Sequence, residues 1–316
     1  MRFGLQLETY TPENGGNPFD RMRAVARLAE NVGFASIWYE DHLMFRAPDR
    51  PGGSVPQMEC LTTLAALAAA TERMEIGMLV LGVPYRNPAL VAKMLATLDV
   101  ISHGRVIAGL GAGWHEEEFT AYGYPFPTVR ERMEGLEEAV QIIDRMLRAR
   151  PADAASFAGA QYAIADALND PPPIRTPRPP ILIGGNGERR TLRLVAQYAD
   201  MCNVYGTMEE VTRRFAVLRQ HCAEVGRPYE SITRTMNHWT LTAWEDMHAA
   251  KRARYPKAGT IHSPDETIAV LKRYEEAGVE YAIVKLLDAG EMEPVRLFAE
   301  TVLPAFTESF SHHSSF

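Results

Sequence analysis

The sequence predicts a (β/α)8 TIM barrel, and two observations carry that prediction. Short β-rich runs alternate with amphipathic helical stretches along the 316 residues, which is the pattern of βα units and a parallel sheet. Eight such units in a chain of this length match the size of a barrel. A doubly wound sheet is the alternative, but it usually has fewer strands and a glycine-rich turn after the first one, where this chain has only TYTPENGGNP.

The predicted strands are short runs rich in β-branched and aromatic residues between polar segments. They cover residues 3–8, 36–39, 75–80, 105–109, 181–184, 201–205, 232–241 and 281–287. A helical segment follows each strand. The first helix begins near Phe19 and stops at Gly33, where a left-handed cap costs a glycine little. Residues 133–147 carry an apolar stripe at spacings of three and four, and residues 207–210 and 263–266 both match the capping box.

Two segments exceed ordinary loop lengths, residues 114–128 and residues 150–180. The second follows the fourth strand and holds seven of the 21 prolines, so we expect it to be extended and to cross the surface between units four and five. Long loops in a barrel enzyme often act as lids, and we expect both to cover the substrate. Residues 1–316 are predicted to form a single barrel domain with an inserted region at about 150–180.

Composition excludes several classes of protein. The chain has no apolar stretch of about 18 residues, and its N-terminus MRFGLQLETY resembles a strand more than a signal peptide, so we expect a cytoplasmic protein without membrane contact. A net charge of −7 argues against a surface that binds nucleic acid. Three scattered cysteines form neither a disulfide framework nor a zinc spacing, and residues 115–118 (HEEE) are expected to be a helix face, so no metal is predicted.

The stretch ILIGGNGERR, residues 181–190, predicts an anion site. Its glycines allow a tight turn that brings backbone N–H groups to the start of a helix, where a phosphate is favoured. Arg189, Arg190 and Arg193 follow, although they cannot all face one point on a helix. An ordinary flexible turn before a solvated helix is the alternative. The position of the turn after a strand in an eight-unit pattern favours phosphate.

The C-terminal ends of barrel strands carry the active site, which directs attention to the pair Asp41 and His42 after the second strand. A histidine there can act as a general acid or base near neutral pH, and the aspartate beside it can orient the loop. The alternative is a structural histidine next to an N-capping aspartate. Tyr10, Trp114 and His238 reach the same end, and such aromatic walls suit a planar ring.

Four segments, in this order, resemble the bacterial luciferase-like superfamily, within it the branch that uses the deazaflavin coenzyme F420. They are AENVGFASIWYEDHL, YRNPALVAKMLATLDVISHGRVIAGLGAGWHEEEFTAYG, FAGAQY…PPPIRTPRPPILIGGNGERRTLRLVAQYADMCNVYG and SPDETIAVLKRYEEAGVEYAIV. The resemblance implies a (β/α)8 barrel that binds a flavin or deazaflavin at its C-terminal mouth. Members transfer a hydride at the deazaflavin C5 or, with FMN, activate oxygen.

The resemblance also implies roles for individual residues. Asp41 and His42 match the catalytic pair that contacts the ring, and a non-prolyl cis peptide that supports the ring would fall near Met78 and Leu79, to within one residue. The glycine turn would hold the cofactor phosphate. The predicted cofactor-binding residues are Met78, Leu79, Gly111, Gly113, Gly184, Gly185, Asn186 and Gly187, and the predicted substrate-binding residues are Tyr10, Trp114 and His238.

Two departures from the family pattern refine the prediction. Trp114 stands where the sugar-phosphate dehydrogenases have a catalytic glutamate, which argues against a sugar-phosphate substrate. Asp-His after the second strand, instead of the Glu-His-His of the oxygen-activating luciferases, favours coenzyme F420 over FMN. We therefore expect an F420-dependent oxidoreductase that acts on a small organic molecule, as a homodimer by family habit. An FMN-dependent monooxygenase with a separate reductase is the alternative, and a non-catalytic flavin-binding barrel is the second alternative.

Overall fold

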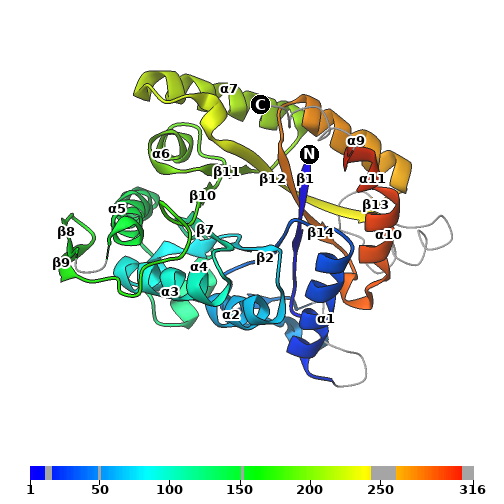
Figure 1. The fold of residues 1–316 in the computed structure, drawn as a ribbon, viewed down its shortest axis with the longest axis horizontal. Coiled ribbons are helices and arrows are strands. Elements are labelled where there is room, and N and C mark those ends of the chain that lie inside the picture. Colours follow the sequence, from blue (N-terminus) through cyan, green and yellow to red (C-terminus); the bar gives the residue numbers. More distant parts are fainter. Residues whose placement is uncertain (11–15, 49–50, 151–152, 243–260, 308–316) are drawn as a thin grey trace.

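The computed structural model describes residues 1–10, 16–48, 51–150, 153–242 and 261–307, and its centre is a closed ring of eight parallel strands (Figure 1). The strands are β1 (Arg2–Gln6), β2 (Ser36–Tyr39), β5 (Glu75–Met78), β7 (Val106–Gly111), β10 (Ile181–Gly184), β11 (Met201–Val204), β12 (Thr233–Thr242) and β14 (Tyr281–Leu286). Each pairs with the next, and β14 pairs with β1, where Arg2 is in register with Tyr281. This closure confirms the barrel and excludes the doubly wound sheet.

The third predicted strand ends earlier than expected. β5 stops at Met78, a cis peptide joins Leu79 to Val80, and a two-residue strand, β6 (Leu81–Gly82), then pairs with β7. The cis peptide therefore lies one bond beyond Met78–Leu79, within the expected one residue.

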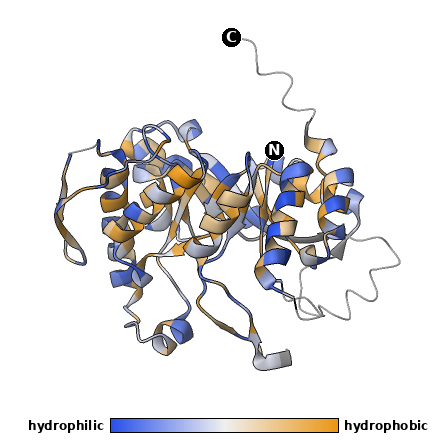
Figure 2. Cartoon of the chain, turned by 60° about the horizontal axis from the view of Figure 1, so that its bottom comes forward, coloured by the Kyte–Doolittle hydropathy of each residue, from blue (hydrophilic) through white to orange (hydrophobic). Residues whose placement is uncertain are grey.

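Helices surround the ring of strands, with polar residues on their outer faces (Figures 1 and 2). They include α1 (Pro18–Asn31), α2 (Cys60–Ala70), α3 (Pro88–Ile101), α5 (Val129–Arg148), α6 (Thr191–Tyr198), α7 (Met208–Val225), α9 (Pro264–Glu276), α10 (Glu293–Thr301) and α11 (Pro304–Thr307). Both predicted capping boxes are present, Thr207 with Glu210 and Ser263 with Glu266. Among the described residues, no helix has the length and apolar character needed to span a membrane.

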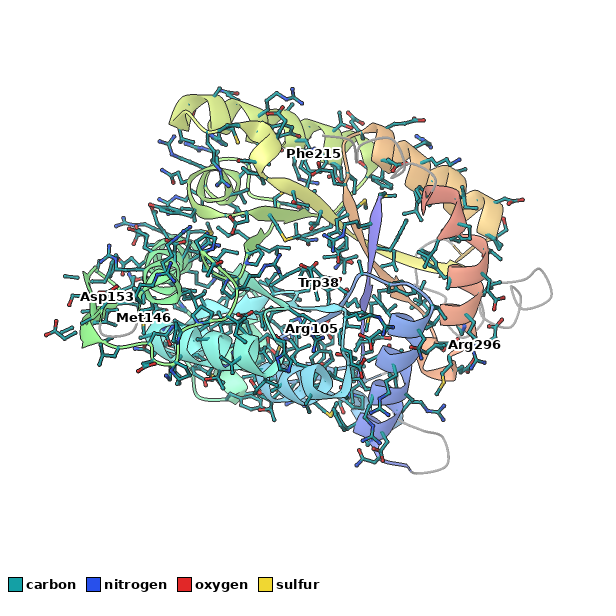
Figure 3. The ribbon with its side chains drawn as sticks, viewed as in Figure 1. Trp38, Arg105, Met146, Asp153, Phe215 and Arg296 are labelled. Carbon is teal, nitrogen blue, oxygen red and sulfur yellow. The ribbon has the colours of Figure 1, made fainter. Side chains whose placement is uncertain are left out.

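The interior of the barrel is packed around Trp38, which lies near the centre of the ring of strands (Figure 3). A β-carbon on Gly4 or Gly77 would lie 2.4 or 2.2 Å from indole atoms, so only glycine leaves room for this side chain. Ile107, Leu182, Met201, Tyr281 and Ile283 complete the cluster. Among the described residues, the N-terminal part of the barrel is therefore a packed core, and the site is expected at the mouth, formed by the C-terminal ends of the strands.

The segment 114–128 lies at the mouth, as predicted. It contains α4 (Glu116–Ala121), whose Glu118 contacts His42 at the end of β2. A lid position was expected for this segment, and the contact with His42 agrees with it.

The segment 150–180 was predicted to be extended and to form a lid over the substrate, and the structure differs from both predictions. It is not simply extended, because β8 (Ala155–Ala158) and β9 (Ala163–Ala167) form a hairpin on the outer side of α5. Glu138 of α5 accepts three backbone N–H bonds at the hairpin turn, at 2.7 to 2.9 Å. Further along, Arg175 binds Glu75 at the first residue of β5, 3.0 Å away. That contact is at the N-terminal end of the barrel, opposite the mouth, so the prediction of a substrate lid is wrong for this segment.

Candidate active site

Buried polar atoms without a protein partner gather at the mouth of the barrel. In the described part of the chain they include Gln6 Oε1, Tyr10 OH, Gln57 Oε1, His115 Nδ1 and Asn237 Oδ1. Gln6, Tyr10, His115 and Asn237 lie on or shortly after β1, β7 and β12. Gln57 follows the short strand β4 (Ser54–Val55) and donates to Glu40, the residue after β2. An unsatisfied buried polar group costs about 1–3 kcal/mol, so protein interiors rarely keep several in one place without a function. The mouth is therefore the candidate ligand site.

His42 is held by a glutamate from α4. Its Nδ1 lies 2.9 Å from Oε1 of Glu118, whose side chain is only 2% exposed. Tyr85 donates its hydroxyl to the same carboxylate at 2.6 Å, and the backbone N–H of Leu43 donates to the other oxygen at 2.9 Å. Glu118 lies in helix α4, in agreement with the expected helix face over residues 115–118, and it is turned inward onto His42.

The charges of this pair stabilise each other. Burial alone would lower the pKa of His42, but the hydrogen bond and charge of Glu118, with the nearby charge of Glu40, raise it above its usual range. Burial would raise the pKa of Glu118, yet the hydrogen bonds from His42 and Tyr85 outweigh it and lower that pKa to about 2. An ion pair is therefore favoured in the mildly acidic to neutral range.

This pair predicts a pH window of stability. Because the pKa of Glu118 is lowered in the folded protein, its ionised form stabilises the fold fully above the usual pKa of 4.5. This stabilisation is lost as pH falls toward about 2. Because the pKa of His42 is raised in the folded protein, its charged form stabilises the fold fully below the usual pKa of 6.5. This stabilisation is lost as pH rises through the raised pKa. The free energy of unfolding lost in Glu118→Gln should therefore be largest between about pH 4.5 and 6.5. Urea denaturation of both proteins across pH measures it, and a loss independent of pH would contradict the ion pair.

Asp41 points away from His42 into a buried ion pair. Its two oxygens accept bonds from Arg86 at 2.7 and 2.8 Å, and one also accepts from the N–H of Gly82 at 2.9 Å. Arg86 also binds Glu59 at 2.6 Å. Asp41 thereby fixes the loop after β6, including the 3-10 turn η2 (Val83–Tyr85) that supplies Tyr85. This arrangement agrees with the prediction that Asp41 orients a loop, and Asp41 caps no helix.

His42, His115 and Glu118 could in principle hold a metal ion, because one ligand atom of each lies within 4.8 Å of the others. No such set was predicted. Two ligands about 2.0–2.1 Å from a tetrahedral zinc would be roughly 3.3 Å apart, whereas His42 Nδ1 and Glu118 Oε1 are separated by 2.9 Å. The spacing of this pair is that of a hydrogen bond, and we interpret the group as a hydrogen-bond network.

The glycine turn after β10 is held against the end of β11. Gly185 has φ +134°, a conformation open to glycine, and its N–H donates to Asn203 at 3.0 Å. The Asn186 side chain donates to the carbonyl of Tyr205 at 3.0 Å and accepts from its N–H at 3.1 Å. Arg190, before α6, provides no side-chain cap, but the N–H of Leu192 in the first turn already donates to the carbonyl of Gly187 at 3.0 Å.

The three arginines after the turn do not act together. Arg193 reaches Glu224 of α7 at 3.5 Å and so turns away from the glycine turn. Arg189 and Arg190 are exposed beside it. This division matches the expectation that the three cannot face one point.

Val80 forms an apolar wall at the mouth. A β-carbon on Gly111 or Gly184 would lie 2.5 or 2.9 Å from its methyl groups, so these glycines make room for it. Gly113, with φ +71°, lets the chain turn toward α4. Met78 is buried beneath, and its carbonyl lies where a β-carbon on Gly109 would be. The predicted cofactor-binding residues of β5, β7 and β10 are thus close together, and their contact with a ring stays a prediction.

The predicted substrate residues differ in their surroundings. Trp114 is 63% exposed, and its ring centre lies 5.7 Å from that of His42. Tyr10 packs on Gly290, and burial raises the pKa of its hydroxyl well above the usual range. His238 belongs to β12, but its side chain lies outside the described part of the structure.

Glu40 orients two amides that sequence patterns did not reveal. Gln6 and Gln57 both donate their side-chain N–H groups to the Glu40 carboxylate, at 3.3 and 3.2 Å. An ionised carboxylate only accepts, so these bonds set the direction of both amides and leave both amide oxygens without a donor. The mouth therefore presents acceptors to ligand O–H or N–H groups.

Comparison with known proteins identifies the family. The model of the luciferase-like monooxygenase family matches residues 1–296. The chain belongs to this family. Its curated relatives include the F420-dependent glucose-6-phosphate dehydrogenase of Microbacterium testaceum (strain StLB037), which is 37% identical over 322 residues, 90% of this chain and 92% of that protein.

A second relative uses a different cofactor. The FMNH(2)-dependent dimethylsulfone monooxygenase of Pseudomonas putida is 34% identical over 167 residues, 53% of this chain and 44% of that protein. Among solved structures, an F420-dependent secondary alcohol dehydrogenase in complex with an F420-acetone adduct has a TM-score of 0.76 at 21% identity and covers 96% of this chain and 98% of its own. That likeness shows the shared fold, and the chain is a luciferase-like oxidoreductase.

Proposed function

We propose that this oxidoreductase transfers a hydride between coenzyme F420 and a small organic substrate. The observation that carries the proposal is the extent of similarity: the F420-dependent relative matches 90% of the chain, whereas the FMNH(2)-dependent one matches 53%. The Asp41-His42 pair at the end of β2 favours the same cofactor. When bound, the deazaflavin would accept or donate the hydride at its C5 carbon.

The residues at the mouth fit such a cofactor. The Gly184–Gly187 turn and the uncapped start of α6 would hold a phosphate, because helix N-termini favour anions. Val80 offers an apolar face to a ring, and Gln6, Gln57 and Tyr10 have polar atoms without partners. His42 would hold or release the proton that accompanies the hydride.

Trp114 supports a substrate that is at least partly apolar. Its exposed indole lies beside His42, at the position where sugar-phosphate dehydrogenases of the family have a catalytic glutamate. An anaerobic assay with F420 and a panel of alcohols tests the activity, with glucose 6-phosphate as the comparison substrate. Loss of the visible absorbance of the oxidised cofactor with an apolar alcohol is the expected result, and turnover of glucose 6-phosphate alone would contradict the assignment of Trp114.

The phosphate site gives a prediction of its own. Gly185→Val places a side chain in the left-handed region and against Thr191, so the turn must move. Affinity for F420 should fall roughly tenfold, about 1.4 kcal/mol, while the dephosphorylated deazaflavin riboside should bind as it does to the wild type. Fluorescence titration measures both. An equal loss for the two ligands would show that the turn does not bind the phosphate.

Two other functions remain as alternatives. An FMN-dependent monooxygenase is favoured by the Pseudomonas putida relative, and a protein purified with bound yellow FMN would support it. A non-catalytic flavin-binding barrel would bind the cofactor yet show no turnover with any substrate. We further propose a single-domain cytoplasmic homodimer, on the family resemblance, and light scattering of the eluted protein tests the dimer.

A further inference from the structure

We propose that Glu118 is a positioning residue that keeps the Nδ1–H of His42 in place and so makes Nε2 the atom that exchanges a proton with the bound ligand. The identity of the ligand rests on the proposed function above. The orientation of the imidazole does not, because it follows from contacts within the chain.

The chemistry of the two partners determines the tautomer. An ionised carboxylate has no hydrogen to donate, so the bond of 2.9 Å to His42 requires a hydrogen on Nδ1. This holds for the charged imidazolium and for the neutral ring alike. In the neutral ring Nε2 is then the bare nitrogen, and only Nε2 gains or loses a proton.

Glu118 is itself held in place. Tyr85 donates to Oε1 at 2.6 Å, and the N–H groups of Leu43 and Met44 point at Oε2 at 2.9 and 3.4 Å. Leu43 and Met44 directly follow His42, so the carboxylate binds both the ring and the backbone that carries it. The imidazole is therefore oriented by a buried group that cannot rotate without breaking several hydrogen bonds.

Other groups around His42 leave this assignment unchanged. Asp41 is committed to Arg86, and His115 Nδ1 is 3.7 Å from Glu118 Oε1, beyond hydrogen-bond distance. Glu40 is a further negative charge that favours the protonated ring. The rings of Phe45 and Trp114 meet the imidazole edge to face, at 5.6 and 5.7 Å between centres. Of these groups, Glu118 is the one whose oxygen lies within hydrogen-bond distance of Nδ1.

With Nδ1–H held by Glu118, proton transfer takes place at Nε2. The Nε2–H bond of the imidazolium breaks as a bond forms between that proton and an electronegative atom of the ligand, and the electron pair stays on Nε2. The reverse step restores the imidazolium. Glu118 keeps its negative charge throughout, because its pKa of about 2 is too low for it to take the proton from Nδ1.

Nitrogen NMR of the cofactor-free protein labelled with 15N-histidine tests the proposal. His42→Gln assigns the His42 signals, and Glu118→Asp serves as a second variant. Glu118→Gln removes the charge and keeps one acceptor oxygen, which can serve either Tyr85 or the N–H of Leu43 but not both. Glu117→Gln is the matched control, because Glu117 is the neighbouring residue in α4 and pairs with Arg46 at 2.5 Å on the surface.

The wild type and Glu117→Gln should show His42 with hydrogen on Nδ1 at high pH. In Glu118→Gln the His42 pKa should fall by about one unit, a tenfold change in proton affinity, and the two neutral tautomers should mix. An unchanged pKa and tautomer in both Glu118 variants would overturn the proposal. The readout requires no cofactor, so failure of the F420 assay would not be mistaken for failure of this inference.

Discussion

Replacing His42 by glutamine should reduce the rate of hydride transfer roughly 10²- to 10⁴-fold, the usual contribution of a general acid or base. Glutamine can still donate to Glu118, so the packing of the mouth is kept while the titratable nitrogen is lost. Affinity for the cofactor should change little, since the ring nitrogen contributes chiefly to proton transfer. Steady-state kinetics with F420 and an accepted substrate measure kcat, and titration measures binding.

His103→Gln is the control for this variant. His103 is exposed in the turn before β7, at the end of the barrel opposite the mouth, and its replacement should leave kcat unchanged. Full turnover by His42→Gln would show that proton transfer does not depend on His42. That outcome would also remove the functional reason for the contact with Glu118.

After the loss of rate in His42→Gln, the next largest expected effect is on stability. Asp41→Asn should lower the free energy of unfolding by about 3 kcal/mol. Breaking a buried ion pair leaves an uncompensated charge and typically costs about 3–5 kcal/mol. Asp41 is 5% exposed, and Arg86 keeps Glu59 as a partner, which places the expected loss at the lower end of that range. Urea denaturation followed by far-ultraviolet circular dichroism measures it.

Glu134→Gln supplies the comparison. Glu134 pairs with Arg130 at 2.8 Å on α5, and the Arg130 side chain is 78% exposed, so loss of this pair should cost much less than loss of the buried Asp41–Arg86 pair. Equal losses in the two variants would mean that burial does not strengthen the Asp41–Arg86 pair. Contacts other than the Asp41–Arg86 pair would then have to hold the loop that carries Tyr85 in place.

The barrel could be predicted from the sequence because its strands and helices are defined by local patterns. Apolar runs of four to six residues give the barrel strands other than β12, which has ten residues, and caps such as Thr207 and Ser263 give helix starts without any tertiary information. The boundary at Met78 could not be found in this way, since the apolar run continues through the cis peptide between Leu79 and Val80.

The candidate site was predictable where one residue or one turn carries the signal. His42 and the Gly184–Gly187 turn are of this kind. Glu118 was missed because it is one of three consecutive glutamates, and only the path of α4 turns it inward. The sequence did contain a weak indication of this, because Glu118 directly precedes the large apolar residue Phe119. Phe119 is fully buried in the structure and lies on the inward side of the helix.

Longer-range pairings explain the remaining differences. Glu40, Gln6 and Gln57 meet across three separate segments, and no spacing in the sequence joins them. The segment 150–180 looked like a lid because of its length and prolines, yet Glu138 and Glu75 bind it to the outer side and base of the barrel. Such contacts depend on where the barrel places its helices, which a one-dimensional pattern does not encode.

The central claim is that the mouth of this barrel binds a deazaflavin, and parallel titration of the purified cofactor-free protein with oxidised F420 and with FMN tests it most directly. Trp114 lies exposed beside His42, so its fluorescence should report binding. We expect saturable quenching by F420, with FMN binding much more weakly. Preferential binding of FMN would move the protein to the monooxygenase class, and binding of neither cofactor would contradict the assignment of the glycine turn and of the mouth as a cofactor site.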